Sequence, residues 1–203
     1  MANILIVNGH YPFPSSTGAL NAAFIERACK LLSENGHDLR TTRVVDDWEI
    51  DTEINHHLWA DVALYQFPLN SMSVPWRLKQ YLDEVFTFGM DGRLAKGDGR
   101  SRKDPSKQYG SGGKLTKLRY MLSVTANAPS VAFNDPAQTL FAGRSVDDLL
   151  APIHINFAFF AMTPLPSFIA HDVSKNPQVD SDFRRFEAHL LTHIAGDQET
   201  SEK

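Results

Sequence analysis

The chain has 203 residues, of which 42% are apolar and 22% are charged, and its formal net charge is −4. This composition is typical of a soluble globular protein with enough length for a sizeable core. The negative charge excludes a surface that holds nucleic acid or an anionic membrane by charge alone.

The single cysteine, Cys29, excludes an internal disulfide and favours a reducing compartment. The apolar start ANILIV is too short for a secretory signal, and no apolar run is long enough to cross a bilayer. We find no internal repeat and no linker. We therefore expect a cytoplasmic protein with one domain over residues 1–195 and a disordered tail over residues 196–203.

Residues 3–7, NILIV, predict a buried strand that Asn8 and Gly9 end. A loop rich in Ser, Thr and Gly follows, and it leads into a helix. Its apolar positions recur three and four residues apart, at Leu20, Phe24, Ala28 and Leu31.

A strand, a small polar loop and a helix N-terminus together favour an anion site, because free N–H groups and the helix dipole attract negative charge. The alternative is that Ser15, Ser16 and Thr17 only cap the helix. The loop lacks the Walker ending and the GxGxxG spacing, which argues against a P-loop NTPase and a conventional dinucleotide site.

Residues 38–45 predict a second strand, whose charged residues suit a sheet edge. A short helix follows around Ile54 and Leu58, and we expect His56 and His57 to form a solvated pair on it.

The stretch over residues 61–86 predicts a buried strand at 62–67, a stop at Pro68, a small polar loop, and a helix that Pro75 introduces. The apolar face of this helix consists of Leu78, Tyr81, Leu82, Val85 and Phe86. Backbone N–H groups in such a loop lie at the carboxyl edge of the sheet, where open α/β folds bind ligands.

Residues 89–113 are rich in glycine and basic residues and show almost no apolar periodicity. A loop of this length is functional or disordered. Either it is a solvated excursion, or it folds over a ligand and brings a cation to a phosphate and Tyr109 to an aromatic ring.

Residues 119–124 predict the next strand, and a third small polar loop, TANAP, follows it. A very apolar helical face over residues 146–160 is broken or entered at Pro152, and it packs on the sheet or on a second subunit. A strand at 165–170 comes next. The last helix carries Phe183, Phe186, Leu190 and Ile194.

Alternating strands and helices predict an α/β flavodoxin-like three-layer sandwich, with a five-stranded parallel sheet in the order 2-1-3-4-5 and helices on both faces. The loops after the first, third and fourth strands then converge. A phosphate would rest on the first loop and a planar polar ring on the other two, which is what a flavin needs.

Four segments resemble the bacterial NADPH:quinone reductases called modulator of drug activity B: NILIVNG, QFPLNSMSVPWRLKQYLDEVF, DGRSRKDPSKQYGSGG and YMLSVTANAP. The middle segment is also similar to the DT-diaphorase type through QFPL and VP. The resemblance covers residues 3–190. It implies tightly bound FAD, NADPH as co-substrate, a homodimer with sites at the subunit interface, and two-electron, ping-pong reduction of quinones.

The resemblance also implies the site residues. The pyrophosphate of FAD would lie on Ser16, Thr17, Gly18, Ala19, Leu20, Asn21, Ala22 and Ala23. The flavin ring would contact Leu69, Asn70, Ser71, Met72, Thr125, Ala126, Asn127 and Ala128. Tyr109 would close over the cofactor and, as the catalytic candidate, donate or orient the proton that the quinone oxygen receives.

The chain departs from the family at residues 69–71, which are Leu-Asn-Ser where the bacterial relatives have Gly-Trp-Trp. The loss of two aromatic walls changes the shape of the quinone pocket. The first loop differs too, with Tyr-Pro-Phe-Pro at residues 11–14 in place of more polar residues.

Other functions stay open: a reductase of azo or nitro compounds, a regulatory flavoprotein bound to a partner such as a potassium efflux system, or a member that binds flavin poorly. The basic loop either meets the extra phosphate of NADPH or faces solvent. His189 and His193 have the spacing of two metal ligands but no evident third, so we expect no metal site.

Overall fold

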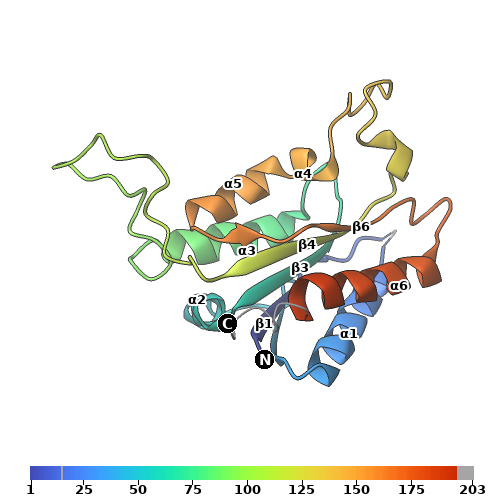
Figure 1. Ribbon diagram of the computed structural model, residues 1–203, viewed down its shortest axis with the longest axis horizontal. Helices are drawn as coiled ribbons and strands as arrows, with labels where there is room; N and C mark the ends of the chain where they lie inside the picture. The colour runs from blue at the N-terminus through green and yellow to red at the C-terminus, as the bar shows by residue number, and fades with distance from the viewer. Residues whose placement is uncertain (15, 196–203) are drawn as a thin grey trace, which may run out of the picture.

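The computed structural model describes residues 1–14 and 16–195, and within them six parallel strands form one sheet between two layers of helices (Figure 1). The strands are β1 (Asn3–Asn8), β2 (Asp38–Arg43), β3 (Val62–Pro68), β4 (Arg119–Thr125), β5 (Thr163–Pro164) and β6 (Phe168–Ala170). Their order is β2-β1-β3-β4-β5, with β6 also paired to β4. The predicted order 2-1-3-4-5 and the edge position of β2 are confirmed.

The predicted strand at 165–170 is present only over its last three residues, as β6, and a separate two-residue strand, β5, precedes the predicted range. β5 pairs with the start of β4 through Thr163 and Pro164, and β6 pairs with the end of β4 through residues 168–170. The interruption falls at Pro166, which has no N–H to donate to the ladder.

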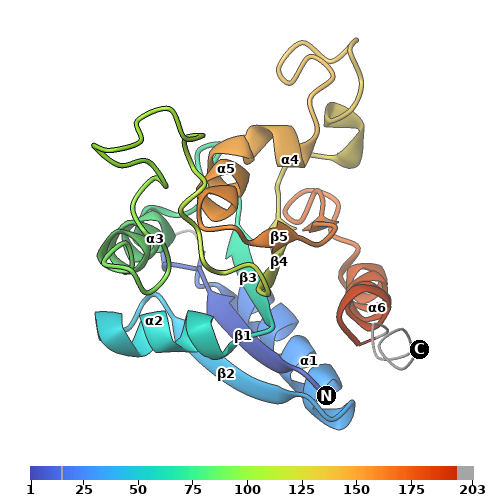
Figure 2. The same ribbon diagram turned by 60° about the vertical axis from the view of Figure 1, so that its left-hand side comes forward.

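Helices cover both faces of the sheet (Figure 2). One face carries α1 (Ala19–Glu34) and α6 (Val179–Leu190), and a π-helical turn, η2 (Leu191–Ala195), extends α6. The other carries α2 (Ile50–Trp59), α3 (Trp76–Phe88), α4 (Val146–Leu149) and α5 (Ala151–Phe159), and a single 3₁₀ turn, η1 (Ser130–Ala132), follows β4. Within the described residues, no helix has the length and apolarity needed to span a membrane.

The predicted face over residues 146–160 is two helices that meet at Leu150. Pro152 lies in the first turn of α5, where its missing N–H removes no helical hydrogen bond. Ile153 and Phe157 are buried on this helix, whereas Ile155 is exposed. The helix is therefore entered at the proline, and only one side of it packs on the sheet.

The core has two halves because each strand of a parallel sheet is buried on both faces. Ile4 and Ile6 pack under α1 and α6, while Leu5 and Val7 pack under the helices of the other face. This explains why NILIV is apolar without alternation.

Residues 89–113 form an arm that projects from the end of the sheet opposite to the carboxyl ends of the strands (Figure 1). The base of the arm is paired, since Lys96 N–H donates to the Gly112 carbonyl at 2.8 Å and Ala95 bridges to Gly113. Within one chain the arm therefore points away from the carboxyl ends of the strands (Figure 1).

A buried polar cluster fixes α2 against the sheet. The Glu53 carboxylate accepts hydrogen bonds from Thr42 Oγ1 at 2.8 Å and from Tyr81 Oη at 2.7 Å. His57 Nδ1 lies 2.8 Å from the Glu53 carbonyl, which can only accept, so Nδ1 carries the hydrogen and Nε2 accepts from Tyr65 Oη at 2.8 Å. The expectation of a solvated pair was wrong for His57, which is fully buried.

Burial lowers the pKa of His57 to about 4. The unfolded chain binds a proton at this residue below about pH 6.5 and the folded chain does not, so stability falls as the pH drops from about 6.5 to about 4. Over that window His57 lowers the free energy of unfolding by about 3 kcal/mol.

Urea unfolding of the wild type and of His57→Gln at pH 7 and pH 4.5 tests this assignment. The free energy of unfolding should fall less between the two pH values in the variant than in the wild type, and an equal fall would contradict the assignment.

Candidate functional site

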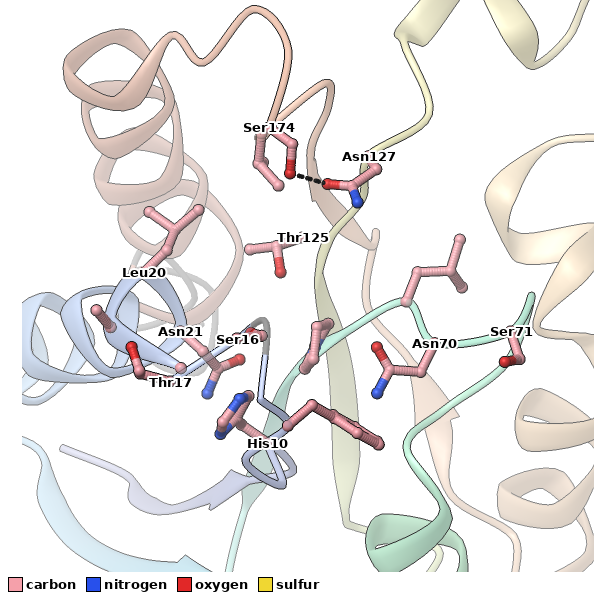
Figure 3. A pocket seen from close by; sticks show the side chains of 16 residues that line it. His10, Ser16, Thr17, Leu20, Asn21, Asn70, Ser71, Thr125, Asn127 and Ser174 are labelled. Carbon is pink, nitrogen blue, oxygen red and sulfur yellow. Dashed lines mark hydrogen bonds between the residues drawn. The ribbon is translucent and has the colours of Figure 1, made fainter.

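A cavity of about 690 Å³ opens at the carboxyl edge of the sheet, where the segments after β1, β3 and β4 meet (Figure 3). Two further residues, Val173 and Ser174, approach from the loop after β6. The segments after β1, β3 and β4 are those whose convergence the sequence predicted.

Most of the predicted binding residues line this cavity. They are Ser16, Thr17, Gly18, Ala19, Leu20, Asn21, Leu69, Asn70, Ser71, Thr125 and Asn127. The cavity lining does not include Ala22, Ala23, Met72, Ala126, Ala128 or Tyr109. Ala126 lies between two lining residues in the sequence but is itself buried, and its N–H donates to the Ala170 carbonyl at 2.8 Å, which continues the pairing with β6.

The first turn of α1 forms one end of the cavity. Its N-cap is Gly18, which has no side chain to accept from the helix, and the turn carries no acidic residue. The capping alternative for Ser16 and Thr17 therefore does not describe this helix end, and Ser15 lies outside the described residues. The main-chain N–H groups of the first turn remain available to an anion, which the helix dipole also favours.

His10 supports this end of the cavity and was missed by the sequence reasoning. It lines the cavity and is nine-tenths buried, and its Nε2 has no hydrogen-bond partner among the described residues. Burial lowers its pKa, so the ring is neutral at pH 7. Gly18 packs directly on the ring, since a Cβ at Gly18 would lie 2.4 Å from it.

A tight turn forms the opposite wall. Asn70 and Ser73 exchange two backbone hydrogen bonds of 2.9 Å, and Ser71 and Met72 between them have φ angles of 47° and 64°. Both lie in the left-handed region, which costs free energy for residues with a Cβ. Leu69 N–H also donates to the Thr125 carbonyl at 2.8 Å, so the loop after β3 and the end of β4 form one continuous surface.

The third wall contains amide and hydroxyl groups. Ser174 Oγ donates to Asn127 Oδ1 at 2.6 Å, which ties the loop after β6 to the loop after β4 (Figure 3). Thr125 and Asn70 add further polar groups to the lining. An uncapped helix N-terminus joined to a wall of donors and acceptors suits a ligand with a phosphate and a polar ring.

Tyr109 belongs to the arm over residues 89–113, and it is not among the residues that line this cavity. Its side chain is 67% exposed and contacts Phe159, with ring centroids 5.6 Å apart, and the guanidinium of Arg100 at 5.2 Å. A single chain therefore does not bring Tyr109 to the predicted cofactor residues.

His189 and His193 lie together at the end of the last helix, with ring centroids 4.4 Å apart. His189 Nε2 is 2.8 Å from the carbonyl of Pro166. Across residues 1–14 and 16–195, no third His, Cys, Asp or Glu joins them as a possible metal ligand.

The sheet order and the cavity at its switch point define an open α/β protein of flavodoxin-like topology. The chain belongs to the family with a flavodoxin-like fold, whose sequence profile matches residues 2–194.

Two relatives cover nearly the whole chain. An uncharacterised protein of Schizosaccharomyces pombe is 43% identical over 187 residues, which are 92% of this chain and 94% of the relative. The NADPH:quinone oxidoreductase MdaB of Haemophilus influenzae is 38% identical over 188 residues, which are 93% of this chain and 97% of the relative.

Solved structures share the fold. A putative quinone reductase of Klebsiella pneumoniae has a TM-score of 0.73 at 22% identity and covers 95% of this chain and 83% of its own. General stress protein 14 of Treponema denticola, solved in complex with FMN, has a TM-score of 0.65 at 20% identity, covering 94% and 97%. An azoreductase of Bacillus anthracis has a TM-score of 0.65 at 14% identity, covering 96% and 99%.

Gly18 and Gly36 provide a matched test of the contact with His10. Both have positive φ, 82° and 78°, but a Cβ at Gly36 would meet nothing within 4 Å. We expect Gly36→Ala to lower the free energy of unfolding by about 1 kcal/mol, the cost of a left-handed alanine. Gly18→Ala should cost more, since it also displaces the ring. Equal losses in urea unfolding would contradict the proposed contact.

Proposed function

We propose that this chain is an FAD-dependent NADPH:quinone oxidoreductase. The observation that carries the proposal is the single cavity that joins the N-terminus of α1 to the two loops after β3 and β4. The 38% identity with the Haemophilus influenzae quinone oxidoreductase, over nearly all of both chains, supports the reaction class.

The residues of the cavity fit a flavin dinucleotide. The N–H groups of the first turn of α1 suit the pyrophosphate, with Ser16, Thr17 and the neutral ring of His10 beside them. The alanines of α1, Ala22 and Ala23, follow one turn later and offer no bulk near the phosphates.

The other two walls suit the flavin ring. Asn70, Ser71, Thr125 and Asn127 offer donors and acceptors to its pyrimidine edge, and the peptide groups of residues 69–72 and 125–128 add more. The same positions tune the reactivity of the ring, because hydrogen bonds near its nitrogen atoms shift its potential.

A flavin bound in this cavity would supply the hydride-transfer chemistry between NADPH and the quinone. The protein has to hold the ring, admit the two substrates in turn to one face, and supply a proton to the quinone oxygen. Such ping-pong use of one site requires no nucleophile in the chain, and none of the cavity-lining side chains is a cysteine or a carboxylate.

We further propose a homodimer in which the arm of one subunit closes the cavity of the other. Tyr109 is exposed on the arm and distant from its own cavity, and Arg102, Lys103 and Lys107 form an exposed basic tip beside it. In this arrangement the partner's Tyr109 covers the flavin ring and orients the proton for the quinone, and the basic tip meets the extra phosphate of NADPH.

Azo compounds are a second class of acceptor. The turn at Asn70 and Ser71 gives the cavity a wall of small polar side chains where the quinone reductase family has aromatic ones. Such a wall leaves room for a longer two-ring acceptor over the flavin.

Replacement of residues 69–71 by Gly-Trp-Trp tests this class of acceptor. The change should raise KM for an azo dye several-fold, because the two aromatic side chains would fill that room, and it should leave FAD binding intact. An unchanged KM would remove the argument for azo compounds.

The first test is the visible spectrum of the purified protein, before and after anaerobic NADPH and then a benzoquinone. We expect a yellow protein that NADPH bleaches and the quinone restores to yellow. A colourless protein that takes up no added FAD would overturn the proposal.

The role of Tyr109 is tested by Tyr109→Phe. We expect the variant to keep FAD and to lose about a hundredfold in quinone turnover, the lower end of a proton-transfer contribution. Tyr11→Phe is the matched control, because it removes the same hydroxyl from a residue that does not line the cavity, while its ring keeps its packing on Phe13 and Trp76. Unchanged turnover of Tyr109→Phe with every quinone would exclude the role.

A further inference from the structure

Four polar side chains form a hydrogen-bonded layer at the base of the cavity: Asn8, Asn21, Gln66 and Ser123. Ser123 Oγ donates to Gln66 Oε1 at 2.6 Å, and Gln66 Nε2 donates to Asn21 Oδ1 at 3.1 Å. Asn21 Nδ2 then donates to Asn8 Oδ1 at 2.7 Å, which also accepts from the His10 N–H at 3.1 Å. We call these four residues the polar floor.

The polar floor connects every main wall of the cavity. Ser123 lies on β4 two residues before Thr125, Gln66 lies on β3 two residues before Pro68, and Asn8 lies two residues before His10. Asn21 itself belongs to the first turn of α1 and lines the cavity (Figure 3). The chain of bonds therefore runs from the ring-facing strand to the anion-binding helix end.

Stability alone does not explain this layer. Gln66, Ser123 and Asn21 are each at least 97% buried, and their neighbours along β3 and β4 are apolar. Apolar side chains of the same shape at these positions would give similar stability, since the net gain from buried hydrogen bonds is small. What a fully paired amide network adds is one defined geometry, because each donor and acceptor admits one arrangement of its partners.

We propose that Gln66 and Ser123 are positioning residues that set the first turn of α1 in register with the loops after β3 and β4, so that the site selects flavins bearing a phosphate. The inference rests on the proposed flavin site. A ligand that touches both ends of the cavity needs both ends at a fixed separation, whereas a ligand that touches only the ring walls does not.

FMN and riboflavin are the probes, because they share the ring and differ only in the phosphate. Flavin fluorescence quenching gives the Kd of each for the wild type, for Gln66→Met and for the milder Ser123→Ala, which removes one oxygen atom. Thermal unfolding shows whether each variant is folded. Gln138→Met, at an exposed glutamine outside the cavity lining, is the matched control.

We expect Gln66→Met to raise the Kd of FMN about tenfold and that of riboflavin less than about twofold. A tenfold change corresponds to the loss of one hydrogen bond, here at the phosphate end of the ligand. Ser123→Ala should shift the two constants in the same sense by a smaller factor. Gln138→Met should change neither.

Two results would overturn the inference: equal weakening of FMN and riboflavin, which would make the polar floor merely a support for the ring walls, or no weakening of FMN in a folded variant. Failure of the proposed function is separate from these. In that case the wild type itself binds none of riboflavin, FMN and FAD, and the inference fails with it.

Discussion

The reversal of winding between β1 and β3 is the constraint on which the rest of the structure depends. The chain leaves β1 through α1 on one face of the sheet and leaves β3 through α3 on the other. Two adjacent parallel strands thus send their following segments to opposite sides, and a crevice opens between them. The cavity, its end at the N-terminus of α1 and its polar walls are all consequences of that topology.

The same constraint explains why the edge of the sheet holds residues that no core or helix would favour. Gly18 adopts a positive φ at the N-cap of α1, and Ser71 and Met72 adopt left-handed conformations in the turn after β3. His10 leaves a buried ring nitrogen without a partner, although buried polar groups are normally paired. Unfavourable local conformations and unpaired polar groups are typical of ligand-binding sites. The two apolar halves of the core, one on each face of the sheet, offset their cost in free energy.

The fold could be predicted from local patterns because each main strand is recognisable from its own residues. NILIV is apolar without alternation because β1 is buried on both faces, and Pro152 marks the start of α5 by its missing N–H. The cavity loops were recognisable because small polar residues follow three strands in turn. His57 and His10 were not recognisable, since their burial depends on contacts with other elements that no local periodicity shows: Tyr65 on β3 for the first and Gly18 at the start of α1 for the second. Tyr109 was assigned by resemblance, and its distance from the cavity within one chain depends on the path of the arm, which glycine-rich sequence does not specify.

The most direct test of the account is a crystal structure of the protein grown with FAD. The account predicts the pyrophosphate at the N-terminus of α1 beside His10, the flavin ring against residues 69–71 and 125–127, and the partner subunit's arm over the ring. Flavin bound elsewhere on the sheet, or a pyrophosphate that makes no contact with the first turn of α1, would contradict the claim that the switch point between β1 and β3 is the working site of this protein.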